Sequence, residues 1–158
     1  MPELASPCGI LVRGPDKHAS QGGAYHAARS RDGRSRFHEG IDICTVPGQP
    51  ILASATCVPQ RIADPYPDEK DGILLGLLVR LMDGIEIKYL YMKPATGIMG
   101  RSVPKGTVLG VAQSLQHLYP GITDHIHVEV WIGGERRDPT PFFIDPPDRG
   151  VSRAVVTT

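Results

Sequence analysis

The sequence has no excess of either charge and no long apolar run. Lys plus Arg and Asp plus Glu both number 17, so the formal net charge is +0. A nucleic-acid-binding domain normally carries a basic excess, and this balance argues against a nucleic-acid partner. No apolar run reaches the roughly 20 residues that a membrane-spanning helix needs. We therefore expect neither a nucleic-acid partner nor a membrane span.

The N-terminus has neither a basic stretch nor an apolar stretch. Residues 1–8 read MPELASPC, which lacks both parts of a secretory signal peptide. Three alternatives stay open. The chain remains in the cytosol, or a leader has been removed, or it reaches the periplasm or cell wall by a non-Sec route or by lysis.

Cysteines are also few, and the sequence has only Cys8, Cys44 and Cys57. For a chain without a visible signal peptide, three buried thiols are the default interpretation. One disulfide with one free cysteine is the alternative.

Glycine and proline are abundant, at 18 and 15 of 158 residues. This composition favours one mostly β domain with long loops, and the length is enough for a core. Residues 1–36 show no periodicity and predict a long loop segment that wraps the domain. We expect an N-terminal arm over 1–21, the domain over 22–143 and a flexible C-terminal tail over 144–158.

The clearest strand signal is a hairpin. Residues 73–82 and 85–92 flank Asp83-Gly84, a strong two-residue turn signal. Residues 125–132 alternate strictly and predict another strand, which Gly133-Gly134 ends. The other expected elements are a strand over 51–62 that breaks near Pro59, a turn into a short strand over 105–111, a solvated acidic loop over 64–72, and a helical turn or rigid bend over 138–141.

Two separated motifs carry the chemistry. His38 and Asp42 lie in HEGID, and His125 and His127 lie in HIH. If both segments are extended, each pair shares a face because side chains alternate with period two. Imidazoles and one carboxylate are the ligands of a hydrolytic zinc site, which has three protein ligands and leaves one position for water.

Other histidines and neighbours have plainer interpretations. We expect His18, His26 and His117 to be surface or satisfied core residues, although His117 precedes HIH in a loop that could reach the site. Glu129 is either a solvent-facing strand residue or a partner to a ligand histidine. Trp131 is expected in the core.

The two motifs resemble the lysostaphin-type, or M23, zinc metallopeptidase family. That family carries H-x-x-x-D and H-x-H on a small antiparallel sheet, and the flanks RFHEGIDICTVPGQPILAS and VPKGTVLG agree as well. The resemblance covers roughly residues 22–143. It implies an M23-like zinc fold in which His38, Asp42 and His127 hold Zn²⁺ and His125 is the general base.

A closer local resemblance is to the leukocyte cell-derived chemotaxin family, carried by YMKP, LYPGITDHIHVE and DPT. That family shares the fold, binds zinc and is regarded as lacking peptidase activity. The resemblance implies a disulfide between Cys8 and Cys44. It also matches the departure at Tyr91, which stands where active M23 peptidases have a histidine that stabilises the transition state.

Two functions follow from these resemblances. The first is a zinc-dependent endopeptidase that hydrolyses peptide cross-links of bacterial peptidoglycan, as a phage lysin or antibacterial effector, with Tyr91 donating its phenolic proton. An effector would have an immunity or delivery protein as partner. The alternative is a catalytically inactive zinc-binding recognition module, which Tyr91 favours. A third, weaker hypothesis is a cytosolic β domain with incidental histidines.

Overall fold

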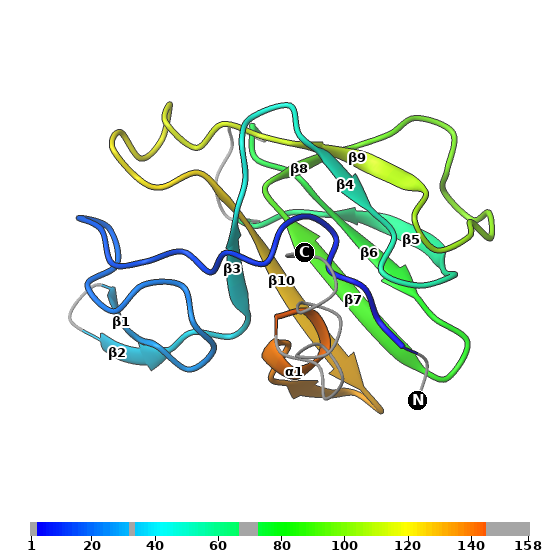
Figure 1. Ribbon diagram of the computed structural model, residues 1–158, viewed down its shortest axis with the longest axis horizontal. Coiled ribbons are helices and arrows are strands. Elements are labelled where there is room, and N and C mark those ends of the chain that lie inside the picture. Colours follow the sequence, from blue (N-terminus) through cyan, green and yellow to red (C-terminus); the bar gives the residue numbers. More distant parts are fainter. Residues whose placement is uncertain (1–2, 32–33, 67–72, 145–158) are drawn as a thin grey trace, which may run out of the picture.

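The computed structural model describes residues 3–31, 34–66 and 73–144, which form short strands and one helical turn (Figure 1). The described elements are β1 (Ala28–Arg31), β2 (Arg34–Phe37), β3 (Ile41–Cys44), β4 (Pro50–Leu52), β5 (Val58–Ala63), β6 (Gly76–Arg80), β7 (Ile85–Leu90), β8 (Met92–Pro94), β9 (Val108–Ala112), β10 (His125–Ile132), β11 (Glu135–Arg137) and α1 (Thr140–Phe143). The predicted tail over 144–158 and the end of the acidic loop lie outside the described residues, apart from Ile144.

Antiparallel pairing joins the strands into two packed sheets and a separate hairpin. The six-stranded sheet has the order β11-β10-β7-β6-β5, with β3 also paired to β10. The three-stranded sheet has the order β4-β9-β8, and β1 pairs only with β2. One edge of β10 pairs with β7, so β3 and β11 share the other edge: β3 takes the first half of β10 and β11 takes the second. The fold is thus mostly β and antiparallel, as predicted.

The core lies between the two sheets. On β7 the residues Ile85, Ile87 and Tyr89 are buried and alternate with half-buried ones, as period two requires. Ile51 and Leu109 from the smaller sheet belong to the same apolar cluster. The buried Tyr89 hydroxyl is satisfied in this core, because it donates to Ser54 Oγ at 2.9 Å.

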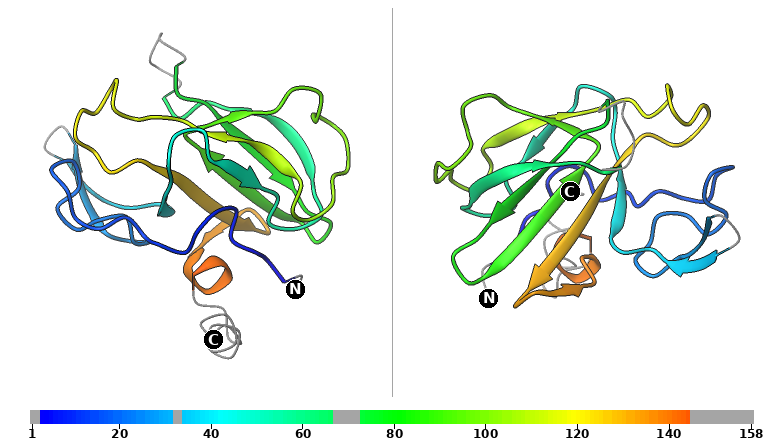
Figure 2. Two further views of the ribbon diagram at one scale, coloured as in Figure 1. Left: turned by 45° about the horizontal axis from the view of Figure 1, so that its top comes forward. Right: turned by 180° about the vertical axis from the view of Figure 1, so that it is seen from behind.

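The N-terminal segment wraps the domain as expected (Figure 2). Leu4 is buried in the core, and the Leu52 amide donates to the Pro7 carbonyl at 2.8 Å. Further along, Val12 forms an isolated antiparallel bridge with Ile43 of β3. The boundary at residue 21 stays a prediction, but the segment before it packs on the sheet.

The structure corrects three predicted elements. The predicted strand over 51–62 is two strands, β4 and β5, and Pro59 lies inside β5 beside a bulge. Residues 28–31 and 34–36, expected as loop, lie in β1 and β2, which pair with each other. The predicted strand over 85–92 ends at Leu90, and β8 begins after Tyr91 in the other sheet. The Asp83-Gly84 hairpin, β10 and the helical turn near Pro139 are confirmed.

The cysteines are free thiols in the structure, so the Cys8–Cys44 disulfide implied by the resemblance is not formed in it. Burial raises the pKa of Cys8 to about 12. Burial also raises the pKa of Cys57 to about 11. Cys57 is buried, as expected, whereas Cys8 and Cys44 are half-buried, so the expectation of three buried thiols is met in full at Cys57 alone.

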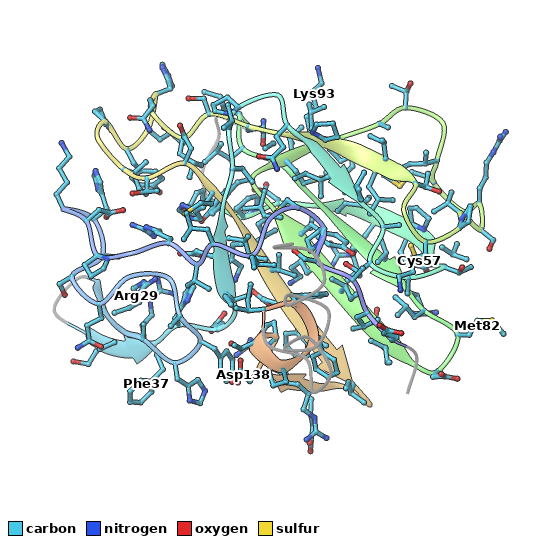
Figure 3. All side chains as sticks on the ribbon, in the orientation of Figure 1. Arg29, Phe37, Cys57, Met82, Lys93 and Asp138 are labelled. Atoms are coloured by element: carbon cyan, nitrogen blue, oxygen red, sulfur yellow. The ribbon has the colours of Figure 1, made fainter. Side chains whose placement is uncertain are left out.

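Some apolar side chains project from the surface (Figure 3). Met82 at the β6–β7 turn is 95% exposed, and Phe37 at the end of β2 is 66% exposed. They are separated in the fold, and isolated exposed apolar residues are normal in globular proteins. Among the described residues, no helix is long and apolar enough to cross a membrane.

Candidate metal centre

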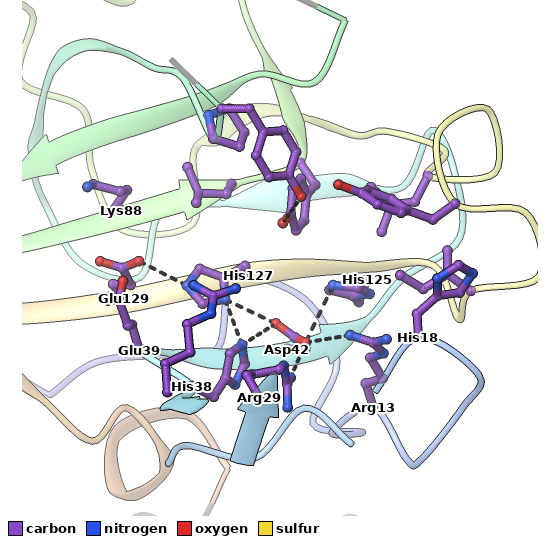
Figure 4. Close-up of a pocket in the computed structure, with 18 of the residues that line it drawn as sticks. Arg13, His18, Arg29, His38, Glu39, Asp42, Lys88, His125, His127 and Glu129 are labelled. Carbon is purple, nitrogen blue, oxygen red and sulfur yellow. Dashed lines mark hydrogen bonds and ion pairs between the residues drawn. The ribbon is translucent and has the colours of Figure 1, made fainter. Parts of the chain in front are cut away.

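Strand pairing brings the two sequence motifs together. In the β3–β10 ladder, His127 is the direct cross-strand partner of Asp42. Directly opposed residues on antiparallel strands have adjacent side chains. His38 joins them from the segment between β2 and β3, three residues before Ile41 at the start of β3. The predicted ligands therefore meet on one face of the sheet (Figure 4).

The three candidate ligand atoms form a nearly equilateral triangle. His38 Nε2 lies 3.1 Å from Asp42 Oδ1, and His127 Nδ1 lies 3.1 Å from the same oxygen. The two imidazole nitrogens are also 3.1 Å apart. Metal–ligand distances of about 2.0–2.1 Å in a tetrahedral site imply ligand separations of roughly 3.3 Å. The triangle thus has the size of one face of a tetrahedral coordination shell.

Hydrogen bonds on the far side of each ring fix where the lone pairs point. His38 Nδ1 lies 3.0 Å from the Ala24 carbonyl oxygen, and His127 Nε2 lies 2.9 Å from Glu129 Oε2. Both oxygens are acceptors, so each of these nitrogens carries the proton. When both rings are neutral, as metal binding requires, the opposite nitrogens present lone pairs to one point, where a carboxylate oxygen also points. Three converging lone pairs on buried groups fit a cation.

Asp42 presents only one of its oxygens to that point. Its other oxygen, Oδ2, accepts a hydrogen bond from Arg13 Nη1 at 3.0 Å and lies 3.5 Å from both Arg29 Nη2 and His125 Nε2. Arg13 is itself held by two 2.8 Å hydrogen bonds to Asp16. Burial alone would raise the pKa of Asp42, but hydrogen bonds from His127 and His38 hold it well below the usual value. The group is a carboxylate fixed for monodentate binding.

His127 responds to the same neighbours. Burial acts to lower its pKa, but the hydrogen bonds to Asp42 and Glu129 outweigh burial and raise the pKa to about 9. Without a metal, a proton therefore occupies the side of the ring that faces Asp42. Because a metal ligand must be deprotonated, a metal ion would displace that proton.

His125, the predicted general base, lies beside the triangle and not in it. Its Nδ1 lies 2.7 Å from the Thr123 carbonyl oxygen and so carries the proton. Burial lowers its pKa, which leaves the ring neutral at pH 7 with a lone pair on Nε2. This nitrogen faces the site near Asp42 Oδ2. The arrangement can accept a proton from a water held at the metal position.

Tyr91 lies on the opposite wall, at a break in the strand. Its φ is 68°, and its amide and that of Met92 both donate to the Leu75 carbonyl, at 2.7 and 3.2 Å. Two donors on one acceptor are typical of a β-bulge, which turns the side chain toward the groove. The Tyr91 ring meets His125 edge-on at 5.4 Å, and its hydroxyl lies 2.9 Å from the Tyr66 hydroxyl. Burial raises its pKa to about 12.

An open groove of about 740 Å³ contains these residues. One wall is aromatic, with Tyr66, Tyr91 and Tyr119, and the other carries Arg29 and Arg36 from the β1–β2 hairpin. His18, expected away from the site, also lines the groove, and its Nε2 lies 3.0 Å from the Pro120 carbonyl oxygen. His117 is exposed and does not line it, and His26 stacks on Tyr25 outside it.

Several groove residues were not predicted. Arg13 lies in an aperiodic segment, and no local signal marks it. Arg29 and Arg36 belong to the basic stretch RSRDGRSR, whose Asp32-Gly33 is a hairpin signal. Glu129 is confirmed as a histidine partner, and it also accepts from Trp131 Nε1 at 3.1 Å. Trp131 is only half-buried, with Arg136 over its ring at 4.6 Å, so its predicted core position is wrong.

Gly40 permits the close approach of the two motifs. A Cβ at this position would meet the Val128 carbonyl oxygen and lie 2.9 Å from His127 Cε1. Both neighbours belong to β10 and have little freedom to move. A side chain here would push HEGID away from the ligand strand.

Comparison with curated proteins finds relatives over most of the chain, although no family model matches it. Leukocyte cell-derived chemotaxin-2 from Bos taurus is 31% identical over 150 residues, covering 90% of this chain and 91% of the relative. The Mus musculus protein of the same name is 32% identical over 124 residues, covering 77% and 73%. Myeloid protein 1 from Gallus gallus is 32% identical over 130 residues, covering 82% of this chain and 36% of that protein.

Solved structures share the fold at low sequence identity. The catalytic domain of the antimicrobial peptidase lysostaphin from Staphylococcus simulans aligns with a TM-score of 0.56 and 20% identity, covering 76% of this chain and 87% of that one. A zinc-containing peptidase from Vibrio cholerae aligns with a TM-score of 0.63 and 16% identity, covering 86% and 39%. The fold is that of the lysostaphin-like M23 peptidases.

Proposed function

The chain belongs to the leukocyte cell-derived chemotaxin-2 family, and from this premise we propose that it is a zinc-binding recognition module that holds a peptide or protein ligand in its groove without hydrolysing it. The observation that carries the proposal is Tyr91. It occupies the wall of the groove that faces His125, and its hydroxyl is already paired with Tyr66.

The donor set supports zinc as the metal. Two neutral imidazoles and one carboxylate oxygen leave one tetrahedral position open. His38 Nε2, Asp42 Oδ1 and His127 Nδ1 would hold the ion. When bound, Zn²⁺ supplies a Lewis acid that attracts a carbonyl or carboxylate oxygen of a ligand.

The state of Tyr91 argues against efficient hydrolysis. Attack on a peptide carbonyl creates an oxyanion, which needs a hydrogen-bond donor besides the metal. Removing one such donor costs about 10²–10³ in rate. Burial raises the pKa of Tyr91 to about 12, so the hydroxyl stays neutral, whereas a histidine could carry a positive charge. The proton of the hydroxyl also has a competing acceptor in Tyr66.

A peptidase acting on peptides such as peptidoglycan cross-links is the second candidate, and His125 is the observation that favours it. Its neutral Nε2 lies 3.5 Å from Asp42 Oδ2, beside the candidate metal ligands, which suits a general base. Under this candidate, the protein would be exported without a Sec signal or released by lysis. As an effector, it would also have an immunity or delivery protein as partner.

One experiment separates the two candidates. The zinc-loaded protein is incubated with purified peptidoglycan sacculi and with pentaglycine, and released fragments are identified by mass spectrometry. We expect no cleavage by the native chain and measurable cleavage by Tyr91→His. Cleavage by the native chain that disappears in His125→Ala would establish the peptidase and reject the recognition module.

A further inference from the structure

The β1–β2 hairpin places two like charges directly opposite each other. Arg29 and Arg36 are cross-strand partners in its register. Like charges in directly opposed positions destabilise an antiparallel pair. Both side chains line the groove beside the metal centre. A local arrangement that costs stability and faces a binding groove is typical of a functional site.

Arg29 is only partly neutralised, by an ion pair between its Nη2 and Asp42 Oδ2 at 3.5 Å. The same Nη2 is buried and has no hydrogen-bond partner among the described residues. Asp42 Oδ2 already accepts from Arg13 at 3.0 Å. The Asp42 carboxylate is therefore shared by two guanidinium groups and by the two ligand histidines. Burial lowers the pKa of Arg29, the charge of Asp42 acts to raise it, and the charges of Arg13 and Arg36 act to lower it.

The position of this pair defines what it would bind. Arg29 Nη2 lies 3.5 Å from Asp42 Oδ2, beside the candidate metal ligands (Figure 4). A guanidinium group presents a planar fork of donors that matches a carboxylate. A peptide whose carbonyl or terminal oxygen lies at the metal position would bring a neighbouring carboxylate to the hairpin. The aromatic wall with Tyr66 and Tyr119 would then contact its apolar part.

We propose that Arg29 and Arg36 form a carboxylate-binding subsite beside the metal centre, so that the groove selects peptides that carry a carboxylate next to the metal-binding group. This inference deepens the proposed function and rests on it. It assigns a role to the β1–β2 hairpin, which lies outside both sheets. It also explains why the repulsive pair is retained at the edge of the groove.

The test compares two probes that differ only in the terminal group. Dansyl-labelled tetraglycine with a free carboxylate and the same peptide with a C-terminal amide are titrated against the zinc-loaded protein by fluorescence anisotropy. We expect the acid to bind at least about tenfold more tightly, since a charge-assisted hydrogen bond is roughly twice as strong as a neutral one. In Arg36→Gln the two probes should bind alike, whereas the exposed Arg101→Gln should keep the preference.

A second measurement needs no ligand. In low salt, Arg36→Gln should raise the Tm of the metal-free protein by about 1–4 °C, because it removes the cross-strand repulsion. Arg101→Gln should leave the Tm unchanged. A lower Tm in Arg36→Gln would show that the arginine stabilises the hairpin, and it would overturn the proposal.

Several titration results would also overturn it. These are equal binding of the two probes by the native protein, binding of neither probe, and a preference that survives in Arg36→Gln, because the zinc ion would then be the carboxylate site. Failure of the proposed function is read separately in the same samples. Metal analysis reports a missing zinc ion, and mass spectrometry reports hydrolysis of the probe.

Discussion

The two walls of the groove differ in how they relate to peptidase chemistry. At the metal end, every candidate ligand has a fixed partner on its far side: Ala24 for His38, Glu129 for His127 and Arg13 for Asp42. At the opposite wall, Tyr91 occupies a strand break and pairs with Tyr66. The metal end is complete, while the wall that would complete a transition-state site is changed. Metal binding and hydrolysis can therefore be tested separately in this protein.

Loss of a ligand should produce the largest effect. His38→Ala removes one of three donors, and we expect the stoichiometric zinc to be lost together with the rise in Tm that zinc gives to the native protein. Metal analysis after dialysis and thermal unfolding measure both. His26→Ala is the matched control, because that ring is exposed and lies outside the triangle. Full zinc occupancy in His38→Ala would disprove the ligand assignment.

The pH dependence of the metal-free protein should be the next largest effect. In the folded protein the pKa of His127 is raised from 6.5 to about 9. Burial acts to lower this pKa, but the interactions with Asp42 and Glu129 outweigh burial. The folded state therefore binds this proton more tightly than the unfolded state does. Its stabilising contribution is fully present below about pH 6.5 and is lost as the pH rises to about 9, at up to about 1.4 kcal/mol per pH unit.

Urea unfolding in the presence of a chelator, between pH 6 and pH 9.5, measures this loss. The zinc-loaded protein should not show it, because the metal takes the place of the proton. A free energy of unfolding that rises over this range in the metal-free protein would contradict the proposed hydrogen-bond arrangement of His127.

Replacing Glu129 should have an intermediate effect. Glu129→Gln keeps the shape but removes the charge that orients His127, and changes of this kind cost about 10–100-fold in metal affinity. Competition titration with a chromophoric zinc chelator gives the dissociation constant. Glu86→Gln, on the half-exposed face of the neighbouring strand, is the control. An unchanged zinc affinity in Glu129→Gln would mean that His127 is oriented by other contacts.

Tyr91→Phe should have the smallest effect on the metal. The Tyr91 hydroxyl pairs with Tyr66 and not with a ligand, so we expect the zinc dissociation constant to stay within about twofold. Measured beside Glu129→Gln, it sharpens the contrast between the two walls. A loss of zinc comparable to that in Glu129→Gln would show that the walls act as one unit.

The convergence of the candidate ligands on one face could be predicted from the sequence, for a physical reason. Strict alternation over 125–132 defines β10, and a face shared by His125 and His127 follows directly from period two. If HEGID is also extended, the sequence further predicts an adjacent strand that carries Asp42. What alternation could not supply was the direct pairing of His127 with Asp42, because register depends on tertiary packing.

The other parts depend on contacts that are distant in sequence. Arg13 reaches Asp42 only because the N-terminal segment wraps β3. Residues 85–92 alternate well enough to predict one strand, yet the strand breaks at Tyr91 because the chain passes from one sheet to the other there. Between β1 and β2 the sequence has the turn signal Asp32-Gly33. The residues on either side of this signal are charged and polar, so hydrophobic periodicity could not predict the two strands.

The most direct test is X-ray absorption spectroscopy of the zinc-loaded protein. Three converging lone pairs predict two imidazole nitrogens and carboxylate oxygen at about 2.0–2.1 Å, without sulfur. The chain has three cysteines, so sulfur ligation is a real competitor. A first shell of nitrogen and oxygen with the multiple-scattering signature of two imidazoles would support the metal centre formed by His38, Asp42 and His127. A sulfur shell at about 2.3 Å would contradict it.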